Sequence, residues 1–100
     1  MRLLNMLGIG KKRGKMIREA LDAGAVIVDV RSELEYRQGH VDGSINIPLD
    51  RISQEIDRLK KMNKPILLCC ASGMRSASAT ASLKTKGIEC LNGGSWRSLV

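Results

Sequence analysis

Short apolar runs alternate along this chain with longer stretches in which apolar residues recur at helical spacing. The apolar runs occupy residues 25–30, 65–69 and 88–91, and a shorter one at 44–48 ends in a proline. A run of this length, rich in β-branched and aliphatic residues, is typical of a strand that is buried on both faces. The pattern therefore predicts at least four strands.

The stretches between these strands predict helices. Ser32 and Glu35 form a capping-box pattern, which predicts a short helix that ends at Gly39. Three further helices are predicted over residues 16–21, 49–59 and 75–86, which end at Gly24, at Asn63-Lys64-Pro65 and at Gly87. Alternating strands and helices predict an α/β fold with a parallel sheet, and 100 residues suffice for one domain with a single core.

Composition narrows the class of protein. Hydrophobic residues make up 43% of the chain but aromatic residues only 2%, so the core must be aliphatic. The cysteines are three in number, an odd count, and two of them are neighbours, which argues against a secreted disulfide scaffold and for a reducing compartment. The single histidine and these cysteines show no paired ligand spacing, so we expect neither a metal nor a cofactor.

The net charge of +7 is concentrated at the N-terminus. Six basic residues and no acidic ones lie in the first eighteen positions, whereas the other 82 residues carry 11 basic and 10 acidic side chains. We therefore divide the chain into a basic arm, residues 1–13, and a domain, residues 14–100. No aromatic residues accompany the arm, so nucleic acid is not an expected partner.

The arm does not have the pattern of a membrane or secretion signal. Its short apolar stretch at residues 3–9 precedes the basic cluster, which reverses the order of a secretory signal. No apolar run approaches the length of about 20 residues that a transmembrane helix needs. We expect a cytoplasmic protein without stable membrane insertion.

Candidate chemistry lies in the loop after the strand at residues 65–69. Cys70 ends this apolar run, Arg75 follows five positions later, and small residues fill most of the gap before a predicted helix. A short loop between a strand and a helix leaves backbone N–H groups unpaired at the positive end of the helix dipole. This field attracts anions and also lowers the pKa of a thiol, and the thiolate is the reactive form of cysteine. The loop therefore predicts covalent chemistry on a small anion, with Cys70 as the nucleophile.

Other polar residues are predicted to meet this loop at one edge of the sheet. Asp29 and Arg31 follow the first long strand, and a turn at Gly93-Gly94 follows the last one. In an open parallel sheet, ligands bind beyond the C-terminal ends of the strands. Because an unpaired buried carboxylate is costly, Asp29 should have a partner. Arg31 faces either the pocket or solvent.

Four motifs in this order resemble those of a single-domain rhodanese, that is, a thiosulfate sulfurtransferase-like protein. The motifs are Val28-Asp29-Val30-Arg31, residues 39–48 from Gly39 to Pro48, the Cys70–Ser76 loop, and Asn92-Gly93-Gly94-Ser95-Trp96. The resemblance implies a small parallel β-sheet of four to five strands with helices on both faces. It also implies that Cys70 carries sulfane sulfur as a persulfide, taken from a donor such as thiosulfate and passed to cyanide or a thiol.

The resemblance also assigns roles to the residues of the loop and its surroundings. Substrate binding falls to Ala71, Ser72, Gly73, Met74, Arg75 and Ser76, and supporting roles fall to Asp29 and Arg31. The resemblance implies that the partner of Asp29 is Arg75 or the loop N–H groups. Ala71 departs from the polar or basic residue that often follows the nucleophile, which weakens the case for thiosulfate itself. Gly73 should supply a backbone geometry that a side chain would obstruct. His40 lies in a turn motif with a structural role, and a general-base role is the alternative; Trp96 is expected to cover the core.

Two other functions compete with sulfur transfer. Cys69 to Arg75 leaves five intervening residues, the spacing of cysteine phosphatases, whereas Cys70 to Arg75 leaves four. Leu68 stands where many such phosphatases carry a histidine, and the four-residue loop should be too tight for a phosphate ester, so phosphatase or arsenate reductase activity is disfavoured. The second competitor is a rhodanese-like module that relays persulfide or binds a partner. The expected partners are a small anionic sulfur donor and a thiol or protein acceptor.

Overall fold

A computed structural model describes residues 2–100 of the chain. Four parallel strands form one sheet in the order β2-β1-β3-β4. Their bounds are Val26–Asp29 for β1, Ile45–Asn46 for β2, Ile66–Cys70 for β3 and Cys90–Ser95 for β4. The α/β fold and the strands predicted from the apolar runs are therefore confirmed. The fully buried β3 lies between β1 and β4, as its uninterrupted apolar sequence predicts.

The last strand departs from the prediction, because β4 continues through Asn92-Gly93-Gly94, where we expected a turn. A Cβ on Gly93 would lie 3.1 Å from the carbonyl oxygen of Leu68 and 3.2 Å from Cγ of Leu67. The absent side chain therefore lets β4 lie close against β3. The pairing of the two strands becomes irregular between Leu68 and Cys70, just before the loop that connects β3 to the next helix.

Helical segments connect the strands. They are α1 (Arg2–Asp22), α2 (Glu33–Arg37), the 3-10 segment η1 (Leu49–Glu55), α3 (Ile56–Met62), α4 (Met74–Thr85) and the 3-10 segment η2 (Trp96–Leu99). The capping box that opens α2 is confirmed, with Ser32 as its N-cap. The helix predicted over residues 49–59 is divided into η1 and α3. Asn63 ends α3 in the left-handed conformation, with φ of 51°, just before Pro65.

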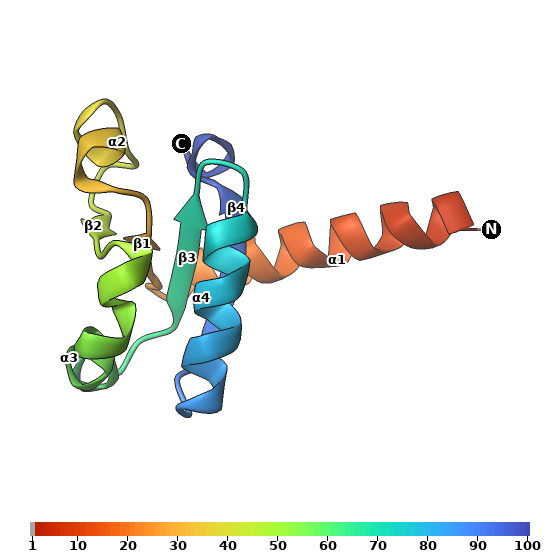
Figure 1. Cartoon of the computed structure of the whole chain (residues 1–100). Coiled ribbons are helices and arrows are strands. Elements are labelled where there is room, and N and C mark those ends of the chain that lie inside the picture. The colour runs from red at the N-terminus through yellow and green to blue at the C-terminus, as the bar shows by residue number, and fades with distance from the viewer. Residues whose placement is uncertain (1) are drawn as a thin grey trace.

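Helices cover both faces of the sheet, as predicted. One face packs against η1, α3 and α4, and its core joins Ile52, Leu59 and Leu83 to Val28 and Leu68 of the strands. On the other face, Leu99 of η2 occupies the space beside Gly93, where a Cβ would lie 3.1 Å from Cδ1 of Leu99. Residues of α1 border a cavity there together with Ser98 and Leu99. Figure 1 shows α3 and α4 on one side of the sheet, with α1 passing on the other.

The first helix extends well beyond the sheet, with its N-terminal end projecting away from the rest of the chain (Figure 1). It runs without interruption across the boundary that we placed between residues 13 and 14. The division into a basic arm and a domain stays a prediction. Arg13 anchors the C-terminal half of α1, since its NH2 group donates to the carbonyl oxygen of Asn92 at 3.2 Å. Within residues 2–100, no helix combines the length and apolar character that crossing a bilayer requires.

Candidate active site

The thiol of Cys70 lies at the C-terminal end of β3, beneath the loop that leads into α4. Its Sγ accepts hydrogen bonds from the backbone N–H of Gly73 at 3.0 Å and from the N–H and hydroxyl of Ser76, both at 3.4 Å. Burial acts to raise the pKa of Cys70, but the hydrogen bonds from the Ser76 hydroxyl and the loop N–H groups outweigh it. The pKa therefore lies below that of an ordinary cysteine.

The loop encloses this sulfur closely. Cys70 has no exposed surface, whereas Ala71 and Ser72 are exposed and Met74 is 79% exposed at the rim. A reactant must therefore enter the loop to reach Sγ. The six residues named as substrate-binding thus divide into an outer rim and an inner lining, and Gly73 and Ser76 place donors on the sulfur through the hydrogen bonds above.

Gly73 has the conformation that we predicted for it. Its φ is +96°, in the left-handed region, and a Cβ placed there would lie 3.2 Å from Cα of Gly94 on β4. A larger residue would be strained in this conformation and would also push the loop away from the sheet. The glycine therefore aims its N–H at Cys70 while the loop packs against β4.

Asn92 braces the loop from β4, a role that we did not predict. Its Nδ2 donates to the carbonyl oxygen of Gly73 at 3.1 Å, and its Oδ1 accepts from the Ser76 hydroxyl at 2.7 Å and from the Gly94 N–H at 3.0 Å. The Ser76 hydroxyl has one proton, for which Oδ1 of Asn92 at 2.7 Å, the carbonyl oxygen of Gly73 at 3.2 Å and Sγ of Cys70 at 3.4 Å compete as acceptors. One feature of the sequence could have indicated this role. The side chain of Asn92 carries both a donor and an acceptor, and Asn92 directly precedes two glycines at the predicted edge of the sheet.

Arg75 does not point into the loop. Its NH1 and NH2 groups donate to Oε1 and Oε2 of Glu35 at 2.7 and 2.9 Å, in a bidentate ion pair. The hydrogen bond from Arg75 lowers the pKa of Glu35 to about 2, despite an opposing effect of burial. Arg75 therefore joins the start of α4 to α2, and its predicted contact with a substrate oxyanion stays a prediction.

The predicted partner of Asp29 was wrong. Asp29 is fully buried and pairs with Arg31, whose Nε and NH2 groups donate to the carboxylate at 2.8–3.0 Å, rather than with Arg75 or loop N–H groups. The side chain two residues along the chain can turn back to Asp29 because the strand has just ended. Arg31 is only 4% exposed and borders a cavity that Ala71 and Trp96 also line, so of the two predicted alternatives it faces the pocket rather than solvent. The hydrogen bond to Asp29 raises the pKa of Arg31.

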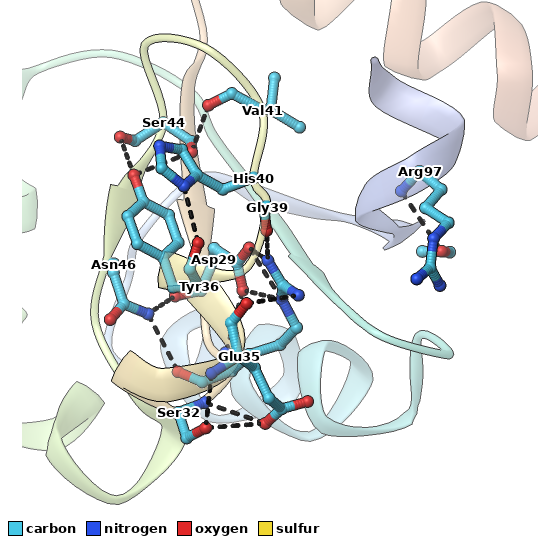
Figure 2. Close-up of polar contacts among 12 residues, drawn as sticks. Asp29, Ser32, Glu35, Tyr36, Gly39, His40, Val41, Ser44, Asn46 and Arg97 are labelled. Carbon is cyan, nitrogen blue, oxygen red and sulfur yellow. Dashed lines mark hydrogen bonds and ion pairs between the residues drawn. The ribbon is translucent and has the colours of Figure 1, made fainter.

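The Arg31 guanidinium holds the segment around α2 in place. It donates to the carbonyl oxygens of Glu35 and Gly39 and lies 4.6 Å from the centre of the Trp96 ring. Figure 2 shows Asp29, Glu35 and Gly39 close together in this network of polar contacts. His40 stacks on Tyr36 and shares a hydrogen bond with its carbonyl oxygen at 2.7 Å. These contacts agree with a structural role for the turn around His40.

The other two cysteines differ from Cys70 in their surroundings. Successive strand residues face opposite sides of a sheet, so Cys69 points away from the loop. Burial first and the nearby Asp29 carboxylate second raise the pKa of Cys69 to about 12. Burial also raises the pKa of Cys90, whose thiol donates to the carbonyl oxygen of Thr80 at 3.5 Å. Only Cys70 is thus surrounded by groups that stabilise a thiolate.

The parallel sheet and the loop that surrounds the Cys70 thiol at its C-terminal edge define a class of α/β folds with a loop-enclosed cysteine. The chain belongs to one family within it, the rhodanese-like domain, whose family model matches residues 15–96.

Two solved structures share the fold. A rhodanese-like domain protein from Staphylococcus aureus is 31% identical with a TM-score of 0.68, over 74% of this chain and 72% of that one. A structure described as a rhodanese with anions from E. coli is 31% identical with a TM-score of 0.67, over 73% of this chain and 88% of that one.

The similarity also extends to a much longer protein. A tRNA uridine(34) hydroxylase from Buchnera aphidicola is 36% identical over 70 residues, which are 65% of this chain and 22% of that protein. This chain thus spans about a fifth of that relative.

Proposed function

We propose that the protein is a sulfurtransferase that carries sulfane sulfur on Cys70 as a persulfide. The observation that carries the proposal is the set of three hydrogen bonds to Sγ of Cys70, from Gly73 N–H and from the N–H and hydroxyl of Ser76. These donors favour the thiolate, which is the nucleophile that sulfur transfer requires. Membership of the rhodanese-like family supports the same conclusion.

With thiosulfate as donor, the reaction has two half-reactions. The Cys70 thiolate attacks the outer sulfur of thiosulfate, a new S–S bond forms, and the S–S bond of thiosulfate breaks as sulfite leaves with the electron pair. The resulting persulfide is anionic, and the loop N–H groups stabilise its charge. A thiophilic acceptor then attacks the outer sulfur: cyanide leaves as thiocyanate and a thiolate leaves as a persulfide. Both acceptors return the Cys70 thiolate, so the kinetics should be ping-pong.

The phosphatase alternative requires Cys69 as the nucleophile, and the surroundings of Cys69 do not support it. Its pKa is raised to about 12 by burial and by the Asp29 carboxylate. Cys69 also faces the side of the sheet opposite to the loop. If Cys69 were the nucleophile, with five residues between it and Arg75, the reactive side chain would be one that the loop does not surround.

A persulfide relay to a partner protein is the second candidate function. The chain spans only 22% of its tRNA uridine(34) hydroxylase relative, so we assign it no part of that hydroxylase activity. Relay and turnover use the same Cys70 persulfide and differ only in the acceptor. The free state of all three cysteines fits a cytoplasmic location for either role.

The proposal is tested by a thiosulfate-to-cyanide transfer assay on the wild type, Cys70→Ser and Cys69→Ser. We expect Cys70→Ser to abolish transfer and Cys69→Ser to keep substantial activity. If Cys69→Ser abolished transfer and Cys70→Ser kept it, the nucleophile would be Cys69, as the phosphatase alternative requires. An inactive wild type that still gains one sulfur atom from thiosulfate would indicate a relay.

A further inference from the structure

A cavity of about 180 Å³ opens beside the loop, next to the nucleophile. It is lined by Arg31, Glu35, Gln38, Gly39, Ala71, Trp96 and Arg97. Ala71 directly follows Cys70, so the cavity borders the outer wall of the loop that encloses the thiol. Because Ala71 has a short side chain without charge, this wall contributes no group that could hold an ion.

Two of the three guanidinium groups at this cavity or at the loop are neutralised by carboxylates. Arg31 is paired with Asp29 at 2.8 Å, and Arg75 is paired with Glu35 at 2.7 Å. The guanidinium of Arg97 has neither an ion pair nor a hydrogen bond among residues 12–100, since only its backbone N–H is engaged, with Ser95. Arg97 therefore supplies an uncompensated positive charge to the cavity wall.

The Arg97 side chain is exposed and contacts Trp96. It lies over the ring of Trp96 at 5.1 Å from the ring centre, a cation–π contact that leaves the guanidinium N–H groups available. Figure 2 shows Arg97 on η2, to one side of the network of Asp29, Glu35 and Gly39. The negative charge nearest to the cavity is Glu35, and its carboxylate oxygens are bound by Arg75.

We propose that this cavity is the docking subsite for the anionic sulfur donor, a small sulfur oxyanion, and that Arg97 is the residue that recruits it. The inference rests on the proposed function, which defines the reactant as an anion that must reach Cys70. Arg97 takes the role that a basic residue at position 71 would otherwise have. A guanidinium fork suits this role, because it binds two oxygens of an oxyanion at once.

The first test measures how the charge of a reagent affects its reaction with Cys70, and it does not depend on sulfur transfer. The rates at which Cys70 reacts with anionic iodoacetate and with neutral iodoacetamide are measured, with the label located by peptide mapping, in wild type, Arg97→Gln and Arg58→Gln. Arg58 on α3 is a matched control that loses the same charge away from the cavity. We expect Arg97→Gln to lower the iodoacetate-to-iodoacetamide rate ratio by about threefold, the size of one unit charge acting across a few ångströms of water, and Arg58→Gln to leave it unchanged.

A rescue variant adds a second readout. Ala71→Lys in the Arg97→Gln background should restore the preference for iodoacetate, and Arg97→Gln should raise the KM for thiosulfate with little change in kcat. An unchanged rate ratio in Arg97→Gln, an equal fall in both variants, or a Cys70 that reacts with neither reagent would overturn the subsite. A lowered ratio in a protein without thiosulfate transfer would support the anion subsite and refute the proposed function instead.

Discussion

Glu35 and Arg75 lie forty residues apart in the chain and form a bidentate ion pair, with NH1–Oε1 at 2.7 Å and NH2–Oε2 at 2.9 Å. The same carboxylate completes the capping box of α2, because its Oε1 also accepts from the N–H of Ser32. One side chain thus fixes the start of α2 and holds the start of α4 against it. In this structure Arg75 positions the loop rather than reaching into it.

We predict that Arg75→Lys keeps the fold but loses most of its thiosulfate turnover, about tenfold, since an ammonium group cannot reproduce the bidentate pair. Glu35→Gln should cause a similar loss. If Arg75 acts by positioning the loop through Glu35, adding Arg75→Lys to Glu35→Gln should lower turnover little further. Steady-state kinetics of the two single variants and the double variant measure this. A full and additive loss in the double mutant would mean that Arg75 binds the oxyanion directly.

The same ion pair should make stability depend on pH in the acidic range. Arg75 lowers the pKa of Glu35 from 4.5 to about 2, so the ionised carboxylate stabilises the fold above about pH 4.5. This contribution is lost as the pH falls toward 2, and solvent screening of a partly exposed pair limits it to about 1 kcal/mol. Urea unfolding at pH 7 and pH 3 should therefore show a smaller drop in the free energy of unfolding for Glu35→Gln than for the wild type. An equal drop would show that the pair adds no stability.

The hydroxyl of Ser76 should help to acidify Cys70. We predict that Ser76→Ala raises the pKa of Cys70 and slows its alkylation by iodoacetamide at pH 7 by about tenfold, the effect of one lost hydrogen bond to a charged group. The measurement is the pH–rate profile of alkylation, which should shift to higher pH. Ser78→Ala is the matched control, an exposed serine on the same helix whose profile should match the wild type. A profile unmoved by Ser76→Ala would leave the loop N–H groups as the whole cause.

The chain could be predicted best where one local pattern decides the structure. The uninterrupted apolar residues of β3 and the capping box at Ser32 depend only on neighbours in sequence, and both were confirmed. The role of Gly73 could be predicted equally well from the sequence, because a tight turn before a helix requires a glycine.

The parts that sequence did not reveal depend on side chains that meet only after folding. The pairing of Glu35 with Arg75 and the bracing of Gly73 by Asn92 join distant elements, and no spacing along the chain encodes them. Asp29 has two arginines of suitable charge within reach of the predicted edge, and only the backbone direction after β1 selects Arg31. The prediction of a turn at Gly93-Gly94 was wrong, because Gly93 allows β4 to pack closely against β3 and Gly94, with φ of +78°, lies at the irregularity in the pairing of the two strands.

Two glycines with similar backbone conformations should respond differently to alanine. Gly73 has φ of +96°, and a Cβ placed on it would lie 3.2 Å from Cα of Gly94, whereas Gly87 has φ of +79° and open space where a Cβ would lie. We predict that both alanine variants lose about 1 kcal/mol from the strained backbone, and that Gly73→Ala loses more because the loop must shift. Thermal unfolding and the transfer assay measure the two effects. Gly87→Ala should keep full activity, and a fully active Gly73→Ala would refute the role assigned to this loop conformation.

The most direct test of the account is the intact mass of the protein after incubation with thiosulfate, before and after the addition of cyanide. The wild type and Cys69→Ser should each gain one sulfur atom, located on Cys70 by peptide mapping, and cyanide should remove it. Cys70→Ser should gain none. A sulfur atom found on Cys69 or Cys90, or a Cys70→Ser variant that still gains and releases sulfur, would contradict the assignment of Cys70 as the sulfur carrier.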